Sequence, residues 1–298
     1  MPTSDEKFMA QALKLAALGG RNVAPNPMVG AIIVKNGKVI GKGYHKKFGG
    51  PHAEVNAIKS VKNKKDLIDS TIYVTLEPCR HHGKTPPCQD LIESVGIKQI
   101  ICIQKDPFQK GKYPPNIRFL KSKESEELNK FYFKWIQKKR PFITVKIAVS
   151  ADGFVAGKNG KPVRITNRKQ DIEVHKLRAQ HQAIVVGSNT VINDDPHLGV
   201  RLIKGKDPLR IILDSKNRIP KTAKVFRNKN YLHIKTVGTI GQSRLFKVFK
   251  QLAKQNISSV LVEPGPTLYQ LLKKQGLIDE LIVLRGKKKI KKGIKIAL

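Results

Sequence analysis

Four side chains in two short stretches have the types and spacing of a metal-dependent hydrolytic site. His52 and Glu54 lie two positions apart in GGPHAEVNAI. The stretch TLEPCRHHGKTPPC supplies Cys79 and Cys88. Imidazole nitrogen and thiolate sulfur are ligands that zinc prefers, and a catalytic zinc keeps one position open for water. A helix that begins at His52 would turn Glu54 towards that opening as a proton carrier, so we predict zinc on the His and both Cys, with Glu54 catalytic.

The order of these residues is typical of zinc deaminases, whose signature is H-x-E followed by P-C-x-x-C. The predicted chemistry is attack of activated water on an amino-substituted aromatic carbon, with loss of ammonia. One feature departs from the signature, because eight residues separate Cys79 from Cys88 where nucleic-acid and nucleoside deaminases usually have two. A purely structural zinc site is the alternative, and it would leave Glu54 without a role.

The charge of the chain keeps a second class of function open. The formal net charge is +36, from 58 Lys and Arg against 22 Asp and Glu, which is a balance that often marks nucleic-acid partners. The lysines are spread along the chain, however, and aromatic residues that could stack on bases make up only 6%. We therefore expect no specific nucleic-acid partner, and keep a tRNA-acting or DNA-acting deaminase or binding protein as a distant alternative.

Cysteine use and hydropathy indicate a cytoplasmic location. Three cysteines cannot build a disulfide framework, and a pair in one short stretch favours metal binding. No stretch approaches the roughly 18 apolar residues of a membrane span, so no membrane partner is expected. The first residues include Asp5 and Glu6 and lack the layout of a signal peptide.

The elements around the predicted zinc site alternate between strands and helices. The pattern predicts a helix over 5–18 capped by Ser4, and then a hairpin over 29–45 that turns at Asn36-Gly37. A helix from Ala53 to about Ser60, the strand STIYVTLEP, the helix CQDLIESVG and the strand KQIICIQKDP follow. This order predicts a three-layer α/β domain with strands buried on both faces.

A second α/β unit is predicted from about residue 140, after a charged helix, KESEELNKFYFKWIQKK. Strands are expected over 183–187, 209–215 and 258–263, with helices over 167–180 and 266–275. The fingerprint G-x-G-x-x-G is absent from the sequence, so a Rossmann site is not indicated. The stretch VLVEPGPTLYQLL predicts a strand, a turn and a helix whose first N–H groups could bind an anion.

Several stretches carry a resemblance that covers nearly the whole chain. APNPMVGAIIV, GGPHAEVNAI and TLEPCRHHGKTPPC closely resemble the bifunctional deaminase/reductase family of riboflavin biosynthesis, as do VKIAVSADG, LRIILDS and EPGPTL. The resemblance implies a cytidine-deaminase-like zinc deaminase domain over 1–139. It also implies a dihydrofolate-reductase-like, NADPH-dependent domain over 140–298 that is shortened at its C-terminus. The implied reactions are deamination of the diaminopyrimidinone ribosylamino 5′-phosphate and then reduction of its ribose to a ribityl chain.

The resemblance also implies roles for individual residues of this chain. In the deaminase half, Asn26 and His45 would hold the pyrimidine ring, and Lys84 and Asp106 would help to bind the ribose phosphate. The implied substrate contacts of the reductase half are Arg178, Leu198, Arg201 and Glu263. The implied contacts to the nicotinamide cofactor are Ala148, Thr190, Asp194, Ser215, Gly265, Pro266 and Thr267.

The second half departs from the family pattern at three positions. Pro162 and Arg164 stand where the family has a small polar residue and a Trp, and Pro264 has no N–H for a phosphate. We hypothesise that the Arg164 cation attracts the phosphates of the cofactor. An alternative is an active deaminase with an inert, structural second half. The partners expected are a phosphorylated pyrimidine and further copies of this chain in a homo-oligomer.

Overall fold

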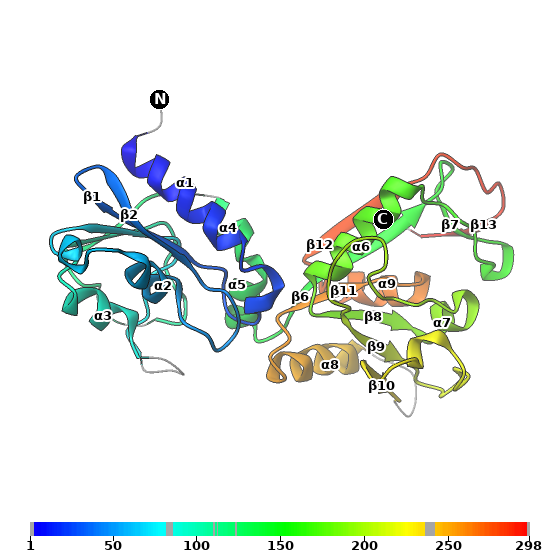
Figure 1. The fold of residues 1–298 in the computed structure, drawn as a ribbon. Coiled ribbons are helices and arrows are strands. Elements are labelled where there is room, and N and C mark those ends of the chain that lie inside the picture. Colours follow the sequence, from blue (N-terminus) through cyan, green and yellow to red (C-terminus); the bar gives the residue numbers. More distant parts are fainter. Residues whose placement is uncertain are drawn as a thin grey trace. The chain divides into compact units, whose positions relative to one another are not determined.

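The chain divides into two units, Met1–Lys138 and Lys139–Leu298 (Figure 1). The structure is a computed structural model that describes residues 3–81, 86–109, 111, 113–122, 124–235 and 242–296. Among these residues, no helix combines the length and the apolar character that a bilayer crossing requires.

The first unit is a mixed five-stranded sheet between helices. Its elements in chain order are α1 (Ser4–Ala17), η1 (Gly20–Val23), β1 (Gly30–Lys35), β2 (Lys38–Tyr44), α2 (Ala53–Ser60), η2 (Lys64–Leu67), β3 (Thr71–Val74), α3 (Cys88–Ser94), β4 (Gln99–Cys102), β5 (Ile117–Phe119), α4 (Glu124–Leu128) and α5 (Lys130–Lys138). The strand order is β2-β1-β3-β4-β5. The strand β1 is antiparallel to both β2 and β3, whereas β3, β4 and β5 run parallel to one another.

Alternation along the strands builds two hydrophobic layers on this sheet. Ile33, Ile72 and Ile100 pack with α2 and α3 on one face. Residues one position away, such as Ile32 and Ile101, pack with α1 on the other face. The predicted hairpin is confirmed, since Asn36 and Gly37 have φ of 50° and 71° between β1 and β2. The predicted three-layer α/β fold is also confirmed.

Two details of the first unit differ from the sequence-based expectation. The cap of α1 is Thr3 rather than Ser4, because Thr3 and Glu6 form a reciprocal capping box. The charged helix expected over residues 123–139 is broken into α4 and α5 at Asn129. The side chain of Asn129 is buried, accepts the Met28 N–H at 2.8 Å and donates to the Met28 carbonyl at 2.9 Å. A partner far away in sequence therefore interrupts the helix.

The second unit contains a six-stranded sheet in which every pair is parallel. Its elements are β6 (Phe142–Val149), β7 (Phe154–Gly157), η3 (Lys158–Gly160), α6 (Arg168–Gln180), β8 (Ala183–Gly187), α7 (Ser188–Asp194), β9 (Leu209–Leu213), η4 (Lys224–Phe226), β10 (Tyr231–Ile234), α8 (Gln242–Lys254), β11 (Ser259–Val262), α9 (Pro266–Lys274), β12 (Glu280–Arg285) and β13 (Gly293–Lys295). The order of the large sheet is β10-β9-β8-β11-β6-β12, and β13 pairs with β7 in a separate two-stranded sheet.

Helices cover both faces of the six-stranded sheet, as expected for parallel strands (Figure 1). On one face, Phe249 of α8 and Tyr269 of α9 pack with Val145 and Val185. On the other face, residues of β8, β9 and β11 pack with Val191 of α7 and with α6. The carboxyl ends of β6, β8 and β11 therefore lie next to one another at one edge, which is where open α/β sheets usually bind ligands.

Candidate active sites

The first candidate site is a cluster of one histidine and two cysteines that the structure brings together as predicted. The nitrogen Nδ1 of His52 lies 3.7 Å from Sγ of Cys79 and 3.3 Å from Sγ of Cys88. The three ligand atoms all lie within 4.8 Å of one another. In a tetrahedral zinc site with ordinary zinc–ligand distances, two ligand atoms are separated by about 3.6 Å. The donor set and its dimensions therefore fit zinc.

The local folds of two helices position these ligands. His52 is the extended residue before α2 and makes no side-chain cap hydrogen bond, which leaves its ring turned towards the cysteines. Cys88 is the first residue of α3, and Cys79 lies in the loop after β3. The helix α2 lies directly against β2 because Gly43 has no side chain. A Cβ on Gly43 would be 2.2 Å from the backbone nitrogen of Ala57.

The electrostatics of the cluster favour a thiolate ligand. Hydrogen bonds from Cys88 and from His52 lower the pKa of the Cys79 thiol to about 4, against the opposing effect of burial. The Cys88 backbone N–H also donates to Cys79 Sγ at 3.3 Å. The hydrogen bond with Cys79 raises the pKa of His52. Zinc binds the thiolate form of cysteine rather than the thiol, and the lowered pKa makes Cys79 a thiolate at neutral pH.

Glu54 lies in the first turn of α2 and outside the ligand set. Its side chain is 4% exposed and lines a cavity of about 330 Å³ that also contains His52 and Cys79. Burial raises the pKa of Glu54 to about 7, despite the opposing charge of His52. A carboxyl group with such a pKa can both accept and return a proton at neutral pH.

The two residues that the resemblance implies for the pyrimidine ring, Asn26 and His45, are in contact in the same cavity. Asn26 Nδ2 lies 3.3 Å from His45 Nε2, and His45 Nδ1 lies 3.0 Å from the Pro51 carbonyl. A carbonyl can only accept, so Nδ1 carries the hydrogen and Nε2 accepts from Asn26. Burial lowers the pKa of His45, which favours this neutral form.

The remaining implied residues of the first site have different outcomes. Asp106 lines the cavity, accepts the Tyr132 hydroxyl at 3.0 Å, and has a pKa raised by burial. Lys84 lies outside the described residues. Sequence reasoning missed Tyr132, although its helix α5 presents an apolar face, and it also missed Glu77. The side chain of Glu77 accepts from Arg80 at 2.8 Å and from the Asp106 N–H at 3.2 Å. Its position in the stretch TLEPC, two residues before the ligand Cys79, could have indicated that it lies near the site.

The second candidate site is a cavity of about 820 Å³ at the carboxyl ends of β6, β8 and β11. Its lining brings together most of the residues implied for substrate and cofactor in this unit: Ala148, Arg164, Arg178, Thr190, Asp194, Arg201, Glu263, Gly265, Pro266 and Thr267. Leu198 and Ser215 lie outside the lining. Leu198 is 2% exposed and belongs to the core beside α7.

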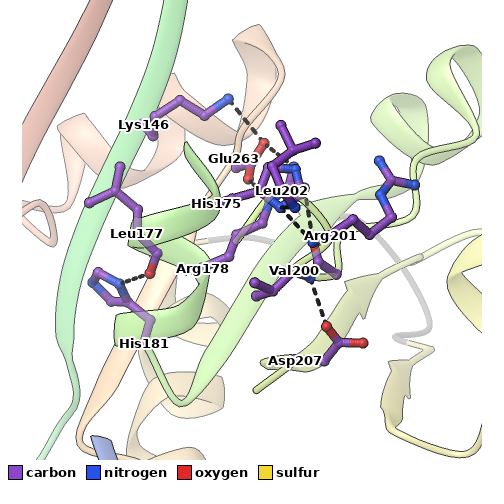
Figure 2. A network of polar contacts seen from close by, with 11 residues as sticks. Lys146, His175, Leu177, Arg178, His181, Val200, Arg201, Leu202, Asp207 and Glu263 are labelled. Atoms are coloured by element: carbon purple, nitrogen blue, oxygen red, sulfur yellow. Dashed lines mark hydrogen bonds and ion pairs between the residues drawn. The ribbon is translucent and has the colours of Figure 1, made fainter. Parts of the chain in front are cut away.

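A buried ion cluster forms one wall of this cavity (Figure 2). Arg178 donates from Nε to Glu263 Oε1 at 2.8 Å and from Nη2 to Oε2 at 3.1 Å. Lys146 Nζ lies 3.0 Å from the same Oε2. Burial alone would raise the pKa of Glu263, but the two cations hold it well below its usual range. Sequence reasoning missed Lys146, whose signal was a lysine inside the apolar strand FITVKIAV.

One side of the cavity is formed by α7 and by the start of α9. Gly265 precedes α9 and provides no side-chain cap, so the first N–H groups of the helix lack one. Burial raises the pKa of Asp194, and the charge of Lys146 opposes this. Arg164 lines the cavity and pairs with Asp171 at 2.8 Å. Its charge is therefore shared with a carboxylate, which weakens any attraction to a phosphate.

Comparisons with known proteins give a match for each of the two units. Residues 2–104 match the family model for the cytidine and deoxycytidylate deaminase zinc-binding region, and residues 141–286 match the RibD C-terminal domain. The riboflavin biosynthesis protein RibD of Aquifex aeolicus is 37% identical, over 98% of this chain and 89% of that protein. The structure of RibD from Acinetobacter baumannii has a TM-score of 0.88 at 31% identity, covering 98% of this chain and 89% of that one. A diaminohydroxyphosphoribosylaminopyrimidine deaminase/5-amino-6-(5-phosphoribosylamino)uracil reductase from Thermotoga maritima has a TM-score of 0.86 at 35% identity, with the same coverage.

Proposed function

Because this chain belongs to the RibD family of riboflavin biosynthesis, we propose that its two cavities carry out the two reactions of the family and assign its residues to them. The chain is a bifunctional enzyme, a zinc-dependent deaminase and an NADPH-dependent reductase. We assign the deaminase to residues 1–139 and the reductase to residues 140–298. The observation that carries the proposal is the buried Glu54 carboxyl beside a His/Cys/Cys metal cluster in one cavity.

In the deaminase cavity, His52, Cys79 and Cys88 would hold the metal. Zinc at this position would supply a Lewis acid that lowers the pKa of water towards about 7. Glu54 takes a proton from the attacking water and delivers it to the amino group that leaves the pyrimidine ring as ammonia. The burial of Glu54 beside the ligand set, in the same cavity as His52 and Cys79, supports this role.

Substrate orientation in this cavity falls to the groups that surround Glu54. Asn26 and His45 form one hydrogen-bonded pair, whose fixed tautomer gives the ring a defined pattern of donors and acceptors. Asp106 is held by the Tyr132 hydroxyl and faces the same space, and we assign it to the ribose. Lys84 is assigned to the phosphate on the family resemblance alone.

In the reductase cavity, NADPH would supply a hydride to C1 of the ribose. The bond between C1 and the ring oxygen breaks, and a proton goes to that oxygen, so that a ribityl chain and NADP+ are the products. We assign the nicotinamide cofactor to Thr190, Asp194 and the turn at Gly265, where the helix start can receive a phosphate. Arg201 lies exposed at the cavity wall and is assigned to the phosphate of the substrate. A second half without activity is less favoured, because the buried Lys146–Glu263–Arg178 cluster faces the cavity.

The test is to supply the diaminopyrimidinone ribosylamino phosphate with and without NADPH, and to follow ammonia and cofactor oxidation separately. Wild type releases ammonia without NADPH and oxidises NADPH when it is present. Asp194→Ala should release ammonia normally and lose cofactor oxidation. If wild type releases ammonia but neither binds nor oxidises NADPH, the second half is a scaffold.

The other partners and the location are assigned more coarsely. The substrate is a phosphorylated pyrimidine, and we propose that the chain assembles as a homo-oligomer. A reducing, cytoplasmic location would keep Cys79 and Cys88 available as thiolate ligands. The absence of a specific nucleic-acid partner remains a prediction, which salt-dependent binding measurements with RNA and duplex DNA can test.

A further inference from the structure

Two side chains of α6 hold the backbone of the segment 199–202 from one side (Figure 2). Arg178 Nη1 donates to the Gly199 carbonyl at 3.2 Å. His175 Nδ1 accepts the backbone N–H of Arg201 at 2.8 Å. His175 and Arg178 lie one turn apart on α6 and therefore project from the same face of the helix. The helix contacts a carbonyl and an N–H of this short segment, which fixes its position and its direction.

The contact with His175 requires one protonation state of its ring. A backbone N–H can only donate, so Nδ1 must carry a lone pair. The Leu202 N–H points to the same nitrogen at 3.4 Å, which makes Nδ1 a shared acceptor. The ring is 5% exposed, so water cannot readily replace this acceptor.

The rest of the segment is also anchored, whereas the side chains of Arg201 and Leu202 line the cavity. Val200 N–H donates to Asp207 Oδ1 at 2.7 Å. Leu198 is buried in a left-handed conformation with φ of 57°. Such a conformation costs energy and persists only where surrounding contacts hold it in place. Arg201 lines the cavity, and its guanidinium projects away from the anchored backbone (Figure 2).

The two arginines of the site are therefore in different situations. The guanidinium of Arg178 is engaged by both oxygens of Glu263 and by the Gly199 carbonyl, and its charge is compensated. Arg201 is exposed at the cavity wall and has its backbone, rather than its guanidinium, tied to α6. A planar guanidinium in this position suits forked contacts to a phosphate.

We propose that His175 is a positioning residue of the reduction step: its Nδ1 fixes the backbone of Arg201 so that the guanidinium meets the phosphate of the substrate. This inference rests on the proposed function, in which Arg201 binds that phosphate. His175 touches neither the reacting carbon nor the hydride donor in this role. Its loss therefore weakens binding of the phosphorylated substrate and leaves the chemical step unchanged.

The first experiment compares two substitutions of His175 in the full-length enzyme. His175→Leu removes the acceptor, whereas His175→Asn places an amide oxygen close to the position of Nδ1. With the deaminated phosphorylated pyrimidine as substrate, His175→Leu should raise the KM of reduction about tenfold, which is the effect of one lost hydrogen bond. His175→Asn should stay within about twofold of wild type. If His175→Asn is as impaired as His175→Leu, the acceptor role is wrong.

A double-mutant cycle then separates this inference from the assignment of Arg201. Arg201→Ala should raise the same KM, and adding His175→Leu should change it by less than about twofold, because both changes remove one function. Unchanged KM in Arg201→Ala overturns the phosphate assignment and the inference with it. A raised KM in Arg201→Ala, combined with an additive effect of His175→Leu, overturns the inference alone.

A pH series provides an arm that does not depend on the folding of His175→Leu. The charged groups that face His175 are Asp171 and Arg178 on α6, Arg201 from the segment, and Glu263 at the end of β11. Burial and the two arginines lower the pKa of His175. Below that pKa, Nδ1 is protonated and can no longer accept the Arg201 N–H. As the pH falls, the KM of wild type should therefore rise more steeply than that of His175→Asn. The phosphate of the substrate titrates equally in both enzymes, and identical profiles would overturn the role of His175. NADPH affinity should remain unchanged in each variant that folds.

Discussion

The two cavities differ in what surrounds one buried carboxyl group, Glu54 in the first cavity and Glu263 in the second. In the first unit, burial dominates: the pKa values of Glu54, Glu77 and Asp106 are raised, and that of His45 is lowered. These groups tend towards their neutral forms. In the second unit, the carboxylate of Glu263 stays ionised because two cations surround it. The first cavity is prepared to receive a metal cation and to exchange protons, whereas the second carries fixed charges that can orient an anionic substrate.

This difference predicts that the chemistry of the first site depends on one titratable carboxyl group. Glu54→Gln should reduce ammonia release by about a hundredfold to ten-thousandfold, because the amide cannot transfer the proton. Zinc content should remain near one per chain, and NADPH oxidation with the deaminated substrate should be unchanged. Ammonia release at the wild-type rate in a zinc-loaded Glu54→Gln enzyme would remove Glu54 from the mechanism.

Removal of the metal should affect the stability of the first unit alone. A ligand present at a thousandfold excess over its Kd stabilises the folded state by about 4 kcal/mol, and a chelator removes that contribution. The only tryptophan of the sequence, Trp135, lies in the first unit, so its fluorescence reports the unfolding of that unit. The transition should move to lower denaturant in the chelated protein, while hydrogen exchange of the second unit stays unchanged. Equal shifts in both units would contradict separate sites.

The fixed charges of the second site predict that removing its buried anion destabilises the second unit. Glu263→Gln leaves Arg178 and Lys146 buried without their anion, and should destabilise the second unit by about 3 kcal/mol. Glu173→Gln is a matched control, because Glu173 pairs with Lys176 on the exposed face of α6 and should cost less than about 1 kcal/mol. Urea unfolding followed by hydrogen exchange of the second unit measures both.

The same carboxylate gives the stability of the second unit a defined pH dependence. The folded pKa of Glu263 lies below the unfolded value of about 4.3, so its contribution is fully present above that value. It is lost as the pH falls further towards the folded pKa. Wild type should therefore lose stability more steeply than Glu263→Gln between about pH 5 and pH 3. Parallel curves would show that the cluster does not stabilise the fold.

The smallest expected effect concerns the break between α4 and α5. Asn129→Ala removes two hydrogen bonds to the Met28 backbone and should cost the first unit about 2 kcal/mol. The Trp135 fluorescence transition measures the loss, and the deaminase KM should rise modestly, since α5 carries Tyr132 beside Asp106. An unchanged transition would show that the helix break has another cause.

The two sites also differ in how far the sequence predicts them. The ligand His52 immediately precedes α2, and Cys88 is the first residue of α3. Their types and order are specific enough to predict the metal site and the catalytic role of Glu54 beside it. The ion cluster of the second unit joins Lys146, Arg178 and Glu263, which come from three distant segments without a local motif. The family resemblance implied roles for Arg178 and Glu263, and no pattern in the sequence indicated Lys146.

Contacts between residues far apart in the sequence also explain where the structure differs from the sequence-based expectations. The helical pattern continues through Asn129, and nothing local announces that its side chain bonds to Met28. Likewise, nothing local announces that Leu198 is buried in the core, in a loop that is held by α6 and by Asp207. Its implied contact with the substrate stays a prediction. Tertiary contacts decide such positions, and sequence periodicity does not contain them.

The order of the six-stranded sheet has a consequence for synthesis on the ribosome. Its strand β6 pairs with β11 and β12, which are the last two strands of that sheet to be synthesised. The first unit, whose strands pair within residues 30–119, can fold while β6 still waits for both neighbours. Pairing between strands so far apart in the chain is slow, and the unpaired edges of β6 stay exposed meanwhile. A nascent chain whose first unit has already folded thus still carries an incomplete second sheet, with a strand edge that is prone to aggregation.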